Sequence, residues 1–266
     1  MAAIQLIDFE DIYTAIQELL KIQSTDTVTL ARIKRDINIA YGDIVARKNW
    51  WWNRSITQIQ TKANYSTGTL TVTEGSTSIT FSSAPAPSVA NYKIKINGFP
   101  EIYTIASHTA ASTAATLGVA FLGESSTTAT FKVWKDFIEL PTDCKETFIV
   151  QHQHNTQPML PLGLADYRRL VAVNPDRAGT PIYYTTDDFN SSDQRRLRFF
   201  PSNNTDAITV DIDYIMNLTA LDAAGDEPIM PIEDRDVLFY MAAAHAWTRE
   251  RNEAEAERYR QMGEKK

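Results

Sequence analysis

His152 and His154 are the two residues of this chain whose types and spacing best suit metal chemistry. Residues two apart on a β-strand share a face, so both imidazoles could bind one ion, with Asp143 or Cys144 as further ligands. Two histidines on an exposed strand are more often ordinary polar surface. We therefore predict no metal site and no bound cofactor.

The other candidates for catalysis lack supporting residues. Nothing near Cys144 in the sequence indicates the lowered thiol pKa that a Cys144/His152 nucleophile pair needs. Asp211 and Asp213 fall on the polar face of an alternating strand, and His245 lies among apolar residues of the last helix. The common phosphate-loop, dinucleotide, zinc-protease and serine-hydrolase motifs do not occur. We predict no catalytic residues and no enzymatic activity.

Residues 65–134 predict a compact all-β module. Apolar and hydroxyl residues alternate in 69–73 and again in 77–81, the period of half-buried strands, and Gly75 lies in the turn between them. Further strand-like arms follow, which makes about six short strands, enough for a small barrel or sandwich.

Helical periodicity dominates both ends of the chain. Apolar residues recur every three or four positions over 9–20 and 30–44, which predicts two amphipathic helices packed as a hairpin, with Asp8 capping the first. A long C-terminal helix begins at Pro231. Beyond Arg249 its apolar stripe fades, so we expect the last residues to project from the body.

Three consecutive tryptophans, Trp50, Trp51 and Trp52, follow the second helix. Adjacent helical positions lie about 100° apart and strand neighbours point to opposite faces, so three such rings cannot all face one core. They form a hydrophobic corner, or at least one meets another element or another subunit.

The fold class predicted from these patterns is α+β. A helical framework, made of the N-terminal hairpin and the long C-terminal helix, carries a small antiparallel sheet and the inserted barrel or sandwich. The sheet draws on strand-like segments after the module, residues 147–153, 195–200 and 207–216, and a short helix is expected between them over residues 163–173. Residues 55–60, before the module, also predict a strand. The predicted parts are residues 1–64, the N-terminal half of the framework; 65–134, the inserted module; and 135–266, which completes the framework.

The order of several segments resembles that of head-to-tail adaptor (connector) proteins of tailed bacteriophages. The hairpin around Gly75 resembles the β insertion of that family, and flanking segments follow in the family's order over nearly the whole chain. The segments that carry the resemblance are residues 49–52, 66–76, 92–96, 101–105, 131–134, 137–143, 179–184, 196–201 and 226–231.

This resemblance implies a structural virion protein of the neck, assembled in the host bacterial cytoplasm. In that family a twelvefold ring below the portal joins capsid to tail and surrounds the DNA channel, and the far side of the ring docks the next tail or nozzle component. The terminal helix is expected to face the portal. Because its last part has strong helix formers but no apolar stripe, we expect a partner to stabilise it. The expected portal contacts are Glu253, Glu257, Arg258, Tyr259 and Met262.

A second reading is a carbohydrate- or receptor-binding β module of a phage tail. It requires exposed aromatic rings on the module, for which Tyr65, Tyr92, Phe99 and Tyr103 are the available residues. An enzyme is a third reading, which would require an acid–base or metal site.

Composition limits the partners. The chain has 266 residues, a formal net charge of −7 and a single cysteine. Tight nucleic-acid binding depends on clustered Lys and Arg, so we expect DNA to pass without specific binding. A lone cysteine permits no intrachain disulfide. No signal sequence and no membrane-spanning segment are apparent, so we expect no membrane partner.

Overall fold

The computed structural model describes residues 6–23, 25–153, 157–202 and 206–265. The chain divides into two compact units. The first, here called the helical unit, contains residues 1–55 and 215–266, and the second, the β unit, contains residues 56–214. Each unit is described by itself below.

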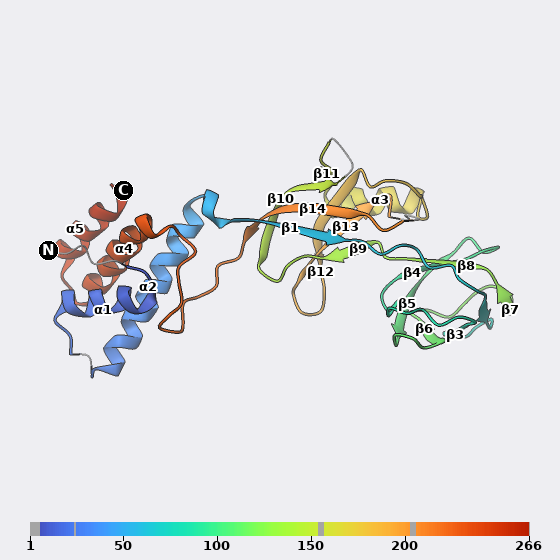
Figure 1. Cartoon of the computed structure of the whole chain (residues 1–266), viewed down its shortest axis with the longest axis horizontal. Coiled ribbons are helices and arrows are strands. Elements are labelled where there is room, and N and C mark those ends of the chain that lie inside the picture. Colours follow the sequence, from blue (N-terminus) through green and yellow to red (C-terminus); the bar gives the residue numbers. More distant parts are fainter. Residues whose placement is uncertain (1–5, 24, 154–156, 203–205, 266) are drawn as a thin grey trace. The chain divides into compact units, whose positions relative to one another are not determined.

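The helical unit is assembled from both ends of the chain (Figure 1). Asp8 caps the first helix as the sequence predicts, because its carboxylate accepts a hydrogen bond from the Asp11 backbone N–H at 2.9 Å. The described helices of this unit are α1 (Phe9–Leu20), α2 (Thr27–Arg47), η1 (Trp51–Asn53), η2 (Ile232–Asp234), α4 (Arg235–Arg249) and α5 (Glu253–Glu264).

One apolar core joins α1, α2 and α4. The residues that the 3.6-residue period places inside are fully buried, among them Phe9, Ile12, Ile33, Ile37 and Leu238. The predicted helix hairpin is confirmed by this packing.

A segment without regular structure, residues 217–231, leads into η2 and α4. Polar side chains of α2 hold it in place, because the Asn38 amide bonds both the backbone N–H and the carbonyl of Leu221, at 2.8 and 2.9 Å. The Tyr41 hydroxyl accepts a bond from the Ile229 N–H at 2.7 Å. Side chains thus satisfy backbone groups that have no ladder partner.

The β unit contains three sheets and one helix, α3 (Leu164–Val173), among its described residues. The first sheet has the order β7-β2-β3-β6-β5-β4-β8, the second β11-β12-β13-β9 and the third β1-β14-β10. The strands are β1 (Arg54–Gln60), β2 (Leu70–Val72), β3 (Ser78–Phe81), β4 (Lys93–Ile96), β5 (Ile102–His108), β6 (Ala114–Leu117), β7 (Ser126–Ala129), β8 (Phe131–Trp134), β9 (Phe137–Glu139), β10 (Cys144–His152), β11 (Leu160–Pro161), β12 (Tyr183–Phe189), β13 (Arg195–Phe200) and β14 (Thr209–Met216).

The seven-stranded sheet contains the predicted hairpin. Its arms β2 and β3 pair antiparallel, with Leu70 opposite Phe81, and Gly75 adopts a φ of 75° in the turn. The sheet is nearly closed, because its two edge strands, β7 and β8, follow one another in the chain and Tyr65 bridges to Val133. Alternate side chains fill its interior, including Leu70, Phe81 and further residues of the same cluster.

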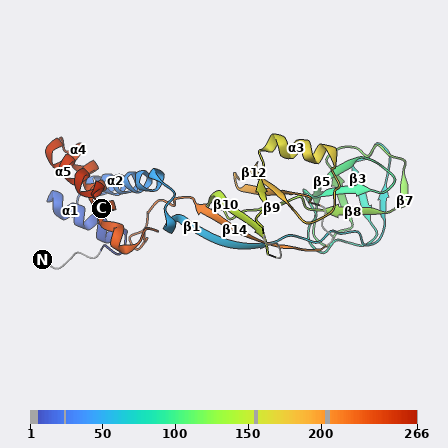
Figure 2. The same ribbon diagram turned by 90° about the horizontal axis from the view of Figure 1, so that it is seen from above.

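The four-stranded sheet carries α3 on one face. Figure 2 shows α3 beside β12. Tyr167 of α3 is buried, and it lies near the guanidinium of Arg198 on β13. A register shift between Thr185 and Asp188 interrupts the β12–β13 ladder.

The predicted fold class is wrong in its balance between helix and sheet. Strand and helix take nearly equal shares, 29% and 30%, and the largest sheet has seven strands and is nearly closed. The chain therefore has a mostly-β core with helices, and not a helical framework with a small sheet. The difference arises in residues 137–216. Their strand-like segments predict one small sheet, but in the structure they supply strands to two sheets.

All seven strands of the first sheet fall within residues 65–134, the range predicted for the inserted module. The two compact units divide the chain elsewhere, at Ser55/Ile56 and Tyr214/Ile215. That residues 65–134 form a separate inserted module stays a prediction.

Candidate functional site

The structure separates the metal candidates near β10. Cys144 and His152 occupy opposite ends of that strand, so eight residue steps place them about 26 Å apart. Asp143 accepts a hydrogen bond from the Tyr214 hydroxyl at 3.2 Å. His154 lies outside the described residues. His152 is buried and cannot share an ion with Asp143 or Cys144.

Cys144 is buried, and burial raises the pKa of its thiol to about 11. The thiolate is the nucleophile, so this side chain is unsuited to nucleophilic catalysis at neutral pH.

We expect the native protein to resist alkylation of Cys144 by iodoacetamide at pH 8. A raised pKa keeps the thiol protonated until the pH approaches 11, so native labelling should be roughly 100-fold slower than labelling of the unfolded chain. Mass spectrometry of samples with and without guanidinium measures both rates. Equal rates would show that the thiol is reactive in the native state.

The other catalytic candidates have structural contacts. Asp211 accepts a bond from the Gln58 amide across the sheet at 2.8 Å, and Asp213 lies on the same face of β14. His245 on α4 lies 3.7 Å from Asp43 on α2. Within the described ranges, no group of three or more His, Cys, Asp or Glu side chains is placed to hold a metal ion.

The C-terminal helix is broken, which corrects the expectation of one long helix. Arg251 adopts a left-handed φ of 60°, which ends α4, and the Asn252 side chain then caps α5 by accepting from the Glu255 N–H at 3.2 Å. Asn252 followed three residues later by Glu255 is a helix-start signal that is present in the sequence.

Helix α5 packs against α4, so the expectation that the chain projects beyond Arg249 is also wrong. A narrow seam of small residues replaces the missing apolar stripe: Ala256 and Gly263 are buried. A Cβ on Gly263 would lie 3.1 Å from the Met241 sulfur, so glycine permits the close approach of the two helices.

Helix α5 carries the five residues expected to contact a portal, and four of them are exposed. Glu253, Glu257 and Arg258 are exposed, and Met262 retains 38% of its surface. Tyr259 is half-buried, with its ring 6.3 Å from that of Tyr240 on α4. The fold places these side chains on one helix.

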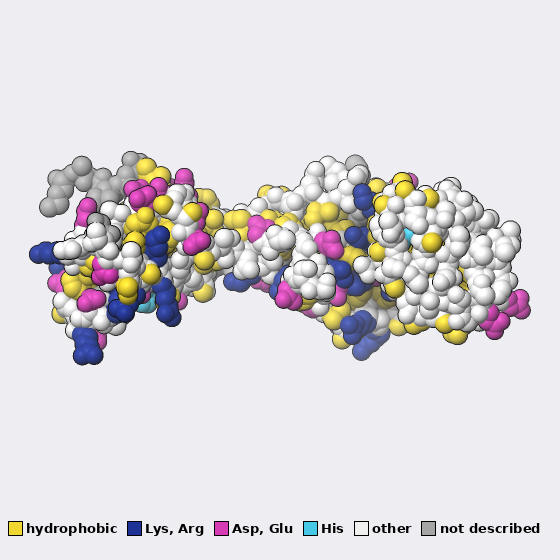
Figure 3. Space-filling model, turned by 90° about the horizontal axis from the view of Figure 1, so that it is seen from below, with side chains coloured by type: hydrophobic (Ala, Val, Ile, Leu, Met, Phe, Trp, Pro, Cys, Tyr) yellow, Lys and Arg dark blue, Asp and Glu magenta, His cyan; other side chains and the backbone are white. Residues whose placement is uncertain are grey.

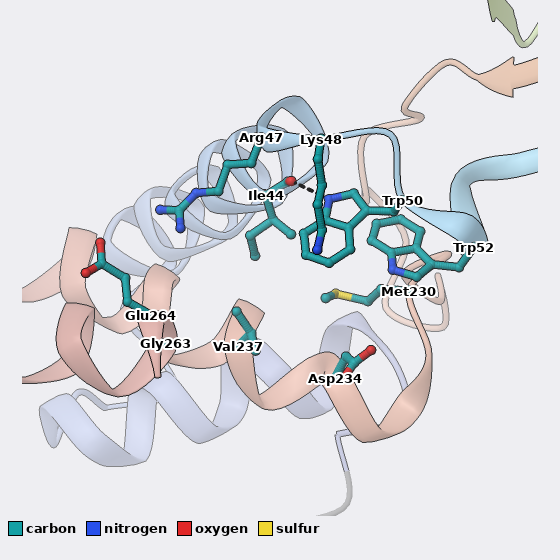
Figure 4. Close-up of a pocket in the computed structure, with 10 residues that line it drawn as sticks. All are labelled: Ile44, Arg47, Lys48, Trp50, Trp52, Met230, Asp234, Val237, Gly263 and Glu264. Carbon is teal, nitrogen blue, oxygen red and sulfur yellow. Dashed lines mark hydrogen bonds between the residues drawn. The ribbon is translucent and has the colours of Figure 1, made fainter. Parts of the chain in front are cut away.

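A pocket of about 250 Å³ opens where α2, α4 and the end of α5 meet (Figure 4). Two of the consecutive tryptophans form one wall: the Trp50 and Trp52 rings stack with centroids 5.6 Å apart. The Trp50 indole N–H donates to the Ile44 carbonyl at 2.7 Å, and the Lys48 ammonium lies 3.8 Å from the centre of the Trp50 ring. The wall is therefore fixed in place.

The remaining lining combines an apolar floor with a charged rim. Ile44, Met230 and Val237 supply the floor. The rim carries two cations and two anions, Arg47, Lys48, Asp234 and Glu264, and Figure 4 shows Arg47 and Glu264 facing each other across the mouth. The three consecutive tryptophans are the sequence signal for this site. Met230 and Val237 are far from them in sequence, and no sequence pattern indicates that these two residues line the pocket.

Trp51 differs from its two neighbours. Its side chain is 71% exposed, and it does not line the pocket. The expected hydrophobic corner thus accounts for two rings only.

The aromatic residues required by the carbohydrate-binding reading are largely internal. Tyr92 and Tyr103 are buried, and Tyr65 and Phe99 pack against the core of the seven-stranded sheet. These four rings do not form an exposed platform.

The β unit also contains a partly buried ionic cluster. Arg198 of β13 donates to Asp136 at 2.7 Å and to Asp188 at 3.0 Å. Burial is the largest influence on the pKa of Tyr167 beside this cluster, and raises it far above its usual range. The second Asp136 oxygen has no hydrogen-bond partner within the described part of the chain. The cluster connects β12 and β13 with the residue before β9, and Tyr167 of α3 lies beside it.

The seven-stranded sheet is poor in charge. Residues 65–134 contain three Lys and three Glu, and the corresponding surface in Figure 3 is mostly uncharged. Among the described helices, none is long and apolar enough to cross a membrane.

Comparison with known proteins gives no assignment: no protein-family model matches the sequence, and no curated protein matches it.

Proposed function

We propose that this chain is a head-to-tail adaptor of a tailed bacteriophage, a structural virion protein that forms a ring below the portal and joins capsid to tail. The proposal is supported by the order of the resembling segments and by one structural observation. Helix α5 packs closely on α4 through the small residues Ala256 and Gly263, while the side chains of Glu253, Glu257, Arg258 and Met262 are left exposed.

The exposed face of α5 has the composition of a docking surface. Its charged side chains are held on the helix by Glu255–Arg258 and Glu257–Arg260 pairs at 3.4 and 2.8 Å, and Gln261 donates to Glu257 at 3.0 Å. Met262 provides an adaptable apolar contact within this polar surround. A polar surface with an apolar anchor suits reversible recognition of a portal.

The same proposal covers the other partners. The adaptor ring, twelvefold by resemblance, surrounds the DNA channel, and its far side receives the next tail or nozzle component. The net charge of −7 supports passage of DNA without specific binding, because an acidic surface repels phosphate. We propose no catalytic role, no cofactor and no membrane partner.

The test is the double variant Arg258→Glu with Met262→Ala. Both side chains are exposed, so the melting temperature of the isolated protein should change little, whereas attachment to DNA-filled capsids should fall and tailless particles should accumulate. Electron microscopy and sedimentation of particles measure this outcome.

The matched control is Arg32→Glu with Val28→Ala, which makes the same kinds of change at exposed positions of α2. It should give normal tailed particles. Normal tails with the α5 variant would contradict docking through α5.

A further inference from the structure

The pocket beside Trp50 and Trp52 has the size of one side chain. Its volume of about 250 Å³ lies below the range of roughly 300–1,000 Å³ usual for small-molecule sites. Its floor is apolar, and its rim carries two positive and two negative side chains, so no net charge favours an ionic occupant. An uncharged aromatic side chain matches this lining.

Arg47 adds a specific electrostatic preference at the pocket mouth. No carboxylate of the described chain lies within ion-pair distance of its guanidinium. Guanidinium groups stack on indole faces, and Lys48 already makes the equivalent contact with Trp50. An incoming indole would give the Arg47 guanidinium an aromatic face to stack on.

Trp51 is the side chain of this protein that fits the description. It is uncharged, aromatic and 71% exposed, whereas Trp50 and Trp52 on either side are packed. Indoles anchor protein interfaces because they bury a large area with little loss of conformational freedom.

We propose that Trp51 of one copy inserts into the Trp50/Trp52 pocket of a second copy. Trp51 lies outside its own pocket, so donor and acceptor are different patches. In the arrangement proposed here each copy gives its Trp51 to the next copy, a head-to-tail contact, and does not exchange it reciprocally with one partner. A head-to-tail contact generates a ring when its rotation closes. The inference rests on the proposed ring and names its subunit contact.

The experiment uses the full-length chain and measures its mass by sedimentation velocity at increasing concentration. The donor variant is Trp51→Ala. The acceptor variant is Val237→Phe, whose ring fills the pocket from its own helix. Wild-type protein should form species larger than a dimer, and each variant should self-associate at least about 30-fold more weakly.

Mixing the two variants tests the pairing directly. The donor variant keeps an intact pocket and the acceptor variant keeps Trp51, so an equimolar mixture should form one contact and stop at the heterodimer. Val28→Ala, another change at an exposed apolar position, should associate as wild type does. Melting temperatures of all variants show whether each one is folded.

Four results would overturn the inference. The Trp51→Ala protein or the Val237→Phe protein could have the mass of the wild type, or the mixture of the two could stay monomeric. The fourth is a wild-type protein that stops at the dimer or stays monomeric up to about 1 mM. Capsid docking is measured in the same preparations. A wild-type protein that never self-associates but still docks on capsids would contradict this inference alone. Normal docking by the Arg258→Glu, Met262→Ala protein would instead count against the proposed function.

Discussion

Replacing Arg198 with alanine should lower the free energy of unfolding by about 2–3 kcal/mol, because the buried Asp136 carboxylate loses its donor, whereas Arg198 and Asp188 are themselves 21% and 25% exposed to water. Arg198 neutralises two carboxylates, with N–O distances of 2.7 Å to Asp136 and 3.0 Å to Asp188. The Asp136 side chain is only 9% exposed. Without the guanidinium, its charge would stay buried and uncompensated.

A second substitution separates this cause from lost packing. Changing Asp136 to asparagine in the Arg198→Ala background removes the uncompensated charge and should restore part of the lost stability. Chemical denaturation followed by circular dichroism measures each variant. Hydrogen exchange in β12, β13 and α3 shows whether the loss is local to the cluster.

Arg169→Ala is the matched control, because Arg169 pairs with Asp166 at 3.4 Å on the surface of α3 and is 79% exposed. Exposed pairs contribute at most about 1 kcal/mol, so this variant should melt almost as the wild type does. An Arg198→Ala protein as stable as the control would mean that the cluster does not hold the strands together.

The sequence located the regular elements well where periodicity was strong. Segments 55–60, 195–200 and 207–216 are strands β1, β13 and β14 within two residues, and the predicted helix around 163–173 is α3. In β14 the spacing of apolar residues matches the period of the strand, because one face is buried.

The balance of the fold was missed because several strands carry no such period. Strand β12 has the sequence Tyr-Tyr-Thr-Thr-Asp-Asp-Phe, and its ladder shifts register between Thr185 and Asp188, so side chains do not alternate in and out. Strand β11 has only two residues. Such strands are specified by their partners in space, which the sequence alone does not give.

The packing of α5 was missed for a different reason. Its seam uses Ala256 and Gly263, and neither residue adds to a hydrophobic stripe. Close approach of two helix backbones buries area through small residues, so a search for large apolar side chains overlooks it. The Trp pocket shows the same limit: the Trp run was visible, but Met230 and Val237 reach it only through the tertiary fold.

Replacing Arg235 with alanine should destabilise the helical unit by about 3–5 kcal/mol. Arg235 is 6% exposed, and its guanidinium donates to the carbonyls of Met230 and Pro228 at 3.2 and 3.0 Å and also to the carbonyl of Ile7. One side chain therefore joins the segment before α1, the segment before η2, and α4. Alanine would leave these acceptors without their donors, and an unsatisfied buried acceptor costs about 1–3 kcal/mol.

Arg235→Lys distinguishes shape from charge. Lysine keeps the positive charge near Glu227, which lies 3.2 Å from the guanidinium. A single ammonium group, however, cannot donate to all the carbonyls that the planar guanidinium reaches. We therefore expect lysine to recover only part of the stability in thermal or urea unfolding. Arg260→Ala, which removes an exposed arginine on α5 paired with Glu257, should change stability by less than about 1 kcal/mol. Full recovery of stability with Arg235→Lys would show that charge alone holds these segments together. An Arg235→Ala protein as stable as the Arg260→Ala control would show that the carbonyls find other donors.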